Sequence, residues 1–99
     1  MAYISEAKFA EICEGIRVDR EIIIKHNPIG SDEEILLWML LSCLVSFLSL
    51  GENETPCFTG RPDADTYRRA IRFVLEGRME ESFDINHYLV QMTQEPERL

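Results

Sequence analysis

Residues 31–51, SDEEILLWMLLSCLVSFLSLG, decide the fold. Ser31 is a suitable N-cap, and Glu34 three residues later completes a capping box. Acidic side chains in this first turn suit the positive end of a helix, and Gly51 can take the left-handed conformation that ends one. The sixteen residues Ile35–Leu50 carry no charge. The stretch therefore predicts a helix over about 31–50 that is apolar on nearly all sides.

A helix that is apolar all round has to be covered by other apolar surface. Each of the other predicted helices offers only one apolar face, so a second copy of the chain is the simpler source of cover. We therefore expect a homodimer, with burial inside a monomer as the alternative. The residues of this helix that we expect to bind the partner are Trp38, Leu41, Val45 and Leu48.

A membrane helix is the competing interpretation of the same stretch, and three features oppose it. Sixteen uncharged residues are fewer than the ~20 that span a bilayer. Both flanks are acidic, with no lysine or arginine nearby to set a topology. Ser42, Ser46 and Ser49 also lie along one narrow side, where small residues let another helix approach closely. We expect no association with a membrane.

Helical spacing of apolar residues recurs on both sides of this central segment. A first helical region runs from Ser5 to His26; Gly15 leaves open whether it is one helix or two that are broken near residues 15–19. A further helix starts after Asp63 or Asp65 and ends at Gly77, and a last one follows its N-cap Asp84.

The chain is therefore expected to be a single all-α domain over residues 1–99, a four- to five-helix bundle around the central hydrophobic helix. No segment shows the alternation of a strand. Residues 51–62 are rich in glycine and proline towards their end and predict a loop, and residues 95–99 predict a frayed tail.

Charge and cysteine content limit the classes of function. The net charge is −8, from 18 acidic and 10 basic residues, which disfavours nucleic acid as a partner because such binding depends on neutralising phosphates. The cysteines Cys13, Cys43 and Cys57 are odd in number and lack the spacing of metal ligands. Together with an N-terminus unlike a signal peptide, they indicate a reducing, cytoplasmic location.

Half of the ten basic residues lie within residues 61–78. Arg61, Arg68 and Arg72 could together receive a carboxylate or phosphate, so they are our candidates for nucleic-acid or anion binding. The alternative is a solvated face on which arginines pair with acidic residues four positions away. Those pairs would be Asp65–Arg69 and Arg72–Glu76.

Catalytic signals are weak. Cys57 is the one cysteine in a predicted loop, and a thiolate nucleophile needs a base nearby; His26 and His87 are the only histidines and neither belongs to a catalytic motif. No motif for a metal, nucleotide or other cofactor is present, so we expect none of these. The sequence favours a small acidic protein-interaction module without catalytic activity (an adaptor, regulator or inhibitor). Anion or nucleic-acid binding is the first alternative, and a Cys57-dependent enzyme is the second.

Overall fold

The computed structural model describes residues 2–95, and within that range it contains five helices and no strand. The predicted all-α fold is confirmed. Apart from Glu95, the predicted frayed tail lies outside the described residues. The helices are α1 (Glu6–Val18), α2 (Arg20–His26), α3 (Asp32–Phe47), α4 (Ala64–Leu75) and α5 (Ile85–Thr93).

Four of the five helices begin where the sequence places a cap. In each case the side chain of the capping residue accepts a hydrogen bond from a backbone amide of the first turn, which is left free by helix geometry. At α3 the capping box is complete, since Glu34 also accepts from the amide of Ser31 at 2.8 Å. The four caps are Ser5, Ser31, Asp63 and Asp84.

The first helical region is two helices, the second of the two alternatives left open by the sequence. The break falls at Asp19, while Gly15 lies inside α1. Arg20, the first residue of α2, is buried, and its guanidinium donates to the Thr93 carbonyl at 3.4 Å. In one continuous helix, the charged Arg20 would interrupt the apolar stripe. The chain instead changes direction at Asp19, and the Arg20 guanidinium is bound by the Thr93 carbonyl.

The predicted end of the central helix at Gly51 is wrong. α3 ends at Phe47, and Ser49 takes the left-handed conformation with φ 54°. The chain turns back there because Leu50 packs against the core. The two closing hydrogen bonds, those of a Schellman motif, run from the Leu50 amide to the Val45 carbonyl (3.1 Å) and from the Ser49 amide to the Ser46 carbonyl (3.2 Å).

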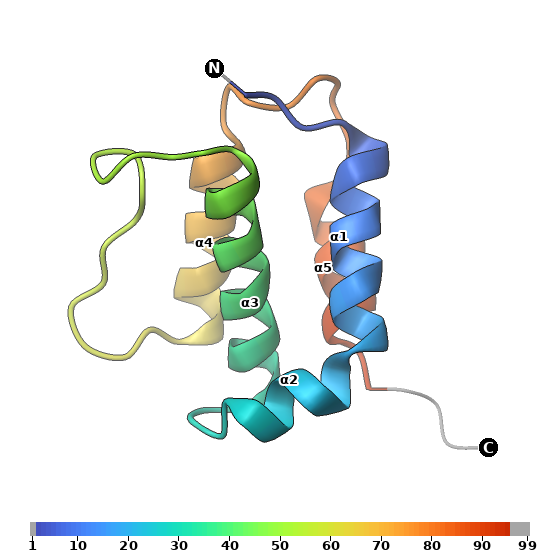
Figure 1. Ribbon diagram of the computed structural model, residues 1–99, viewed down its shortest axis with the longest axis vertical. Coiled ribbons are helices and arrows are strands. Elements are labelled where there is room, and N and C mark those ends of the chain that lie inside the picture. The colour runs from blue at the N-terminus through green and yellow to red at the C-terminus, as the bar shows by residue number, and fades with distance from the viewer. Residues whose placement is uncertain (1, 96–99) are drawn as a thin grey trace.

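The helices form two layers (Figure 1). α1 descends, α2 crosses beneath, and α3 ascends beside α1, so that α1 and α3 are antiparallel. α4 packs against α3, and α5 packs against α1, behind them in this view. α3 contacts each of the other four helices, so the central position predicted for it is confirmed.

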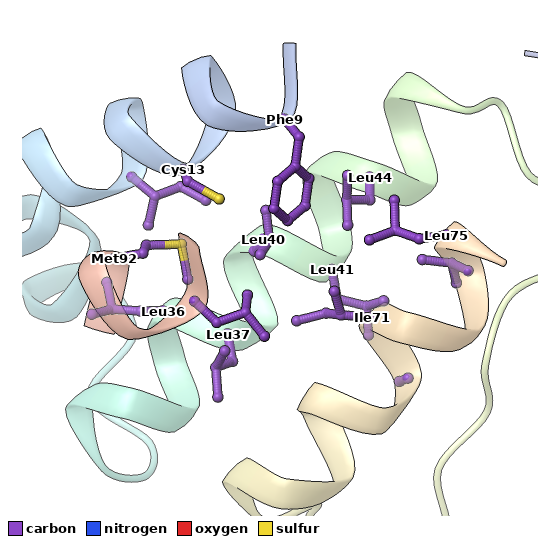
Figure 2. Packing of buried hydrophobic residues seen from close by; sticks show 14 of the residues in the cluster. Phe9, Cys13, Leu36, Leu37, Leu40, Leu41, Leu44, Ile71, Leu75 and Met92 are labelled. Atoms are coloured by element: carbon purple, nitrogen blue, oxygen red, sulfur yellow. The ribbon is translucent and has the colours of Figure 1, made fainter. Parts of the chain in front are cut away.

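The other helices of the same chain bury α3, which removes the main reason for expecting a homodimer. Figure 2 shows Leu41 beside Ile71 of α4, and Leu36 beside Met92 of α5. The premise that the other helices offer too little apolar surface is wrong, because together they cover most of this helix. The buried residues of α3 are Ile35, Leu36, Leu37, Leu40, Leu41 and Leu44, followed by Leu48 at its C-cap.

One contact near the N-terminus has no counterpart in the predictions. Ile4 is fully buried and pairs with Met79 in an isolated β-bridge. Its amide donates to the Arg78 carbonyl at 2.8 Å, and its carbonyl accepts from the Glu80 amide at the same distance. The segment before α1 is thereby fixed to the turn between α4 and α5.

In the described part of the chain, every helix is too short or too polar to cross a bilayer.

We predict that Gly15→Ala stabilises the fold. Gly15 has ordinary helical geometry inside α1, and a Cβ atom there would meet nothing within 4 Å. Alanine should therefore raise the free energy of unfolding by roughly 0.5–1 kcal/mol, as measured by equilibrium urea denaturation.

Gly77→Ala is the matched control. The space around Gly77 is equally open, but its φ is +73°, so a side chain is strained there by roughly 1–2 kcal/mol. Destabilisation by Gly15→Ala, or equal effects of the two substitutions, would contradict the prediction.

Candidate interaction site

A pocket of about 270 Å³ opens where the turn between α2 and α3 meets the start of α4. The turn contributes one wall, α3 the floor, and the end of the 51–62 loop the opposite wall. The lining residues are His26, Asn27, Pro28, Ile29, Glu34, Ile35, Trp38, Arg61, Pro62 and Tyr67.

Apolar side chains dominate this pocket. Ile35 is buried at its base, whereas Trp38 is 40% exposed and Ile29 is 76% exposed. Tyr67 is held from the other side by Phe58, whose ring lies edge-on with 5.5 Å between the ring centroids. The pocket therefore has a fixed aromatic wall and an apolar rim that faces solvent.

The Glu34 carboxylate lies at the mouth of the pocket, where hydrogen bonds fix its position. The Glu34 carboxylate closes the capping box of α3 and accepts a further hydrogen bond from the Arg61 guanidinium at 3.3 Å. Arg61 passes directly over Gly30, where a Cβ atom would lie 2.6 Å from the guanidinium nitrogen. Gly30 also has φ +104°. The positive φ of the turn therefore favours glycine at this position, and a larger residue would also displace the flexible end of the Arg61 side chain.

The same groups set the electrostatics. The pKa of Glu34 is lowered, chiefly by the hydrogen bond from the Ser31 amide; burial opposes this, and smaller lowering effects come from the Ser31 side chain and from Arg61. Burial and the negative charge of Glu34 raise the pKa of Tyr67, while Arg61 opposes that rise. The pocket therefore presents a neutral phenol beside a paired carboxylate.

Every acidic side chain in the first turn of α3 pairs with an arginine from a different element. These arginines come from α2, α4 and the loop, so the pairs connect three parts of the chain to one helix end. The pairs are Asp32–Arg20 (3.5 Å), Glu33–Arg68 and Glu34–Arg61 (3.3 Å).

The predicted cluster of Arg61, Arg68 and Arg72 does not converge on one site. Arg61 and Arg68 pair with the carboxylates of α3, and Arg72 donates to the side-chain oxygen of Asn86 on α5. The positive charges of the first two are therefore already neutralised within the chain, which leaves less for an anion or a nucleic acid.

The four residues of the central helix that we expected to bind a partner separate into two groups. Leu41 and Leu48 are 5% and 3% exposed, so the core of the monomer occupies them. Val45 is half-buried and Trp38 reaches the surface beside the pocket. Trp38 is the one of these four residues that is exposed.

The three cysteines are free and lie in different surroundings. Cys13 is buried, and burial, with a smaller effect of Cys43, raises the pKa of its thiol to about 12. Cys57 is exposed, and its thiol lies 3.9 Å from the Thr55 carbonyl oxygen. The shallow hollow beside Cys57 is lined by residues 57–59, 61–63 and 66, among which there is no histidine.

Within residues 2–95, no three His, Cys, Asp or Glu side chains gather in a group that could hold a metal ion. Asp84 caps α5 by accepting from the amide of His87 at 3.3 Å.

The pocket itself was not anticipated from the sequence. Ile29 carries the one signal that could have indicated it, since a large apolar residue stands between Pro28 and Gly30 in an otherwise polar turn. The contribution of Tyr67 to the pocket was not predicted either.

Comparisons of this chain with protein-family models, with curated proteins and with solved structures found no match. The function therefore has to be argued from the site alone.

We predict an acid-sensitive contribution of Glu34 to stability. Its pKa in the folded state lies below the ordinary value of 4.5. The stability that it contributes is therefore fully present above pH 4.5 and is lost as the pH falls through the lower folded value. Glu34→Gln should be less stable than the parent protein at neutral pH, and the difference should shrink in more acidic solution.

Urea denaturation at a series of pH values measures this difference. Glu52→Gln, at an exposed position of the 51–62 loop, is the control and should leave the pH profile of the parent unchanged. A Glu34→Gln deficit that stays constant throughout the acid range would contradict the assigned role of this carboxylate.

Proposed function

We propose that this chain is a small acidic helical protein-interaction module, an adaptor, regulator or inhibitor that acts without catalysis. The observation that supports this most directly is the pocket in which Trp38, Tyr67 and Arg61 lie beside the exposed Ile29. Tryptophan, tyrosine and arginine are the residues that most often dominate the energy of protein interfaces.

The size and lining of the pocket indicate the chemistry of its occupant. Its volume of about 270 Å³ falls just below the ~300–1,000 Å³ typical of sites for cofactors and drug-sized ligands. A volume of this kind suits one apolar side chain presented by a partner protein. The Arg61 guanidinium is hydrogen-bonded to Glu34 at the rim, and its remaining N–H groups can donate to a backbone carbonyl of the same partner.

The alternatives receive less support. Anion or nucleic-acid binding would have to break the pairs of Arg61 and Arg68 with the carboxylates of α3. For an enzyme dependent on Cys57, the hollow around the thiol offers Arg61 and Asp63 but no imidazole. We also propose that the protein forms a homodimer and resides in the cytoplasm; the three free cysteines are compatible with a reducing compartment.

Loss of the Trp38 ring should weaken partner binding. We predict that Trp38→Ala weakens the partner's affinity by roughly 30-fold or more, the effect of losing a residue that contributes at least ~2 kcal/mol at an interface. The partner is obtained by affinity capture with the parent protein and identified by mass spectrometry. Trp38 is the only tryptophan, so its fluorescence should report binding of the purified partner.

Two further variants control this experiment. Ile29→Ala, at a position 76% exposed beside the pocket, should also weaken binding while leaving the fold intact. Phe73→Ala removes an aromatic ring that is 58% exposed on α4 and outside the pocket, and it should bind normally. A partner retained by both Trp38→Ala and Ile29→Ala would refute the pocket as the binding site.

A further inference from the structure

The pocket beside Trp38 carries a pair of opposite charges at its mouth. The Arg61 guanidinium donates to the Glu34 carboxylate at 3.3 Å. Apart from these two groups and the imidazole of His26, the side chains of the lining are apolar, aromatic or uncharged. A ligand that fills the pocket therefore needs an apolar part for the interior and two opposite charges for the mouth.

Both charged groups keep hydrogen-bonding capacity for such a ligand. The hydrogen bonds that Glu34 accepts from the Ser31 amide and from Arg61 both go to Oε1, which leaves Oε2 to accept from a ligand. The bond from Arg61 uses Nη2 of a guanidinium that has several further N–H donors, and this side chain is 59% exposed. The pair can therefore bind a ligand without being broken.

A ligand with a single charge does not match this arrangement. An anion drawn to Arg61 would meet the Glu34 carboxylate, and a cation drawn to Glu34 would meet the guanidinium. An α-amino acid matches both, because its ammonium nitrogen and its carboxylate oxygens lie roughly 3 Å apart across a single carbon atom. This spacing is close to the 3.3 Å between Arg61 and Glu34, so the charges of the ligand and the protein would alternate in sign.

The interior of the pocket suits an aromatic side chain. Ile35 is buried at its base, and Trp38 and Tyr67 contribute aromatic rings, which attract a further ring beyond the effect of burial. An apolar cavity of about 150 Å³ holds a benzene molecule, so the volume of about 270 Å³ accommodates a phenyl ring together with the backbone atoms of an amino acid.

We propose that this pocket binds a free α-amino acid with an aromatic side chain, whose carboxylate pairs with Arg61 and whose ammonium group pairs with Glu34. The consequence for regulation rests on the proposed function. The amino acid occupies the space that the apolar side chain of the protein partner needs, so the two compete. Binding of the partner then falls as the concentration of the amino acid rises.

Titration of the full chain with L-phenylalanine, followed by the fluorescence of Trp38, tests the proposal without any partner. We expect a saturable change. Three analogues each lack one feature: 3-phenylpropanoate has no ammonium group, 2-phenylethylamine has no carboxylate, and L-serine has no ring. Each should bind at least ~10-fold more weakly, because a charged group or the apolar interior is left without its counterpart. Equal affinities for L-phenylalanine and the two singly charged analogues would overturn the proposal.

Variants of the two charged residues assign each contact. Arg61→Gln should weaken binding of L-phenylalanine at least ~10-fold but should not weaken binding of 2-phenylethylamine, which has no carboxylate. Glu34→Gln should weaken binding of L-phenylalanine but not of 3-phenylpropanoate, which has no ammonium group. Arg69→Gln removes an exposed arginine of α4 outside the pocket and should bind all ligands like the parent protein.

Unchanged binding of L-phenylalanine by Arg61→Gln and by Glu34→Gln would overturn the assigned contacts. The comparison of the ligands in the parent protein does not depend on these variants, so it decides the proposal even if a substitution disturbs the pocket.

The outcomes separate this inference from the function on which the regulation rests. Absence of L-phenylalanine binding would overturn the inference, whereas a captured partner that depends on Trp38 and Ile29 would still support the pocket as a protein-binding site. A partner whose binding is unaffected by saturating L-phenylalanine would overturn the competition but not the binding of the amino acid.

Discussion

A helix that is uncharged after its first turn can remain in water only if apolar surface covers it, and this requirement places the other helices of the fold. α3 carries seven buried apolar residues up to and including its C-cap. At roughly 1.5–3 kcal/mol for each large aliphatic side chain removed from water, their burial is the largest stabilising contribution that a single helix makes here. The short, half-apolar helices α1, α4 and α5 have little reason to be helical alone; packing against α3 supplies the surface that each needs.

The second constraint acts at the beginning of the same helix. Three acidic residues in the first turn favour the positive end of the helix dipole, and each also has an arginine partner from elsewhere in the chain. These ion pairs lie at or near the surface and each contributes little to stability. Their effect is to fix positions: the pair between Glu34 and Arg61 brings the end of the 51–62 loop over Gly30. That placement forms the wall of the pocket opposite Ile29.

Local signals in the sequence were sufficient to predict where the helices begin, but not to predict the pocket. Ser31 with Glu34, Asp63 and Asp84 act within three residues of themselves, so their capping roles could be predicted. The pocket depends on pairs such as Glu34–Arg61 and Glu33–Arg68, whose members are 27 and 35 residues apart. The sequence offered Asp65–Arg69 and Arg72–Glu76 as pairs four positions apart. In the fold, Arg72 instead donates to Asn86 of α5, which is 14 positions away. The end of α3 was mispredicted for a related reason, because burial of Leu50 outweighed the preference of the left-handed position for glycine over Ser49.

Folding constrains the residue types on the buried side of α3 but not those on its exposed side. On the buried side, an apolar residue is required for the chain to fold, so its presence says nothing about function. On the exposed side, lysine or glutamate at Ser42 or Ser46 would fit the helix as well as serine, since both positions are exposed and charged residues form helices readily. Folding therefore does not explain why this side has no charge, in a protein where more than a quarter of the residues are charged. The protein-interaction function that we propose would explain it, since the core of a protein interface is poor in charge and rich in aromatic residues, of which Phe47 is exposed on this side.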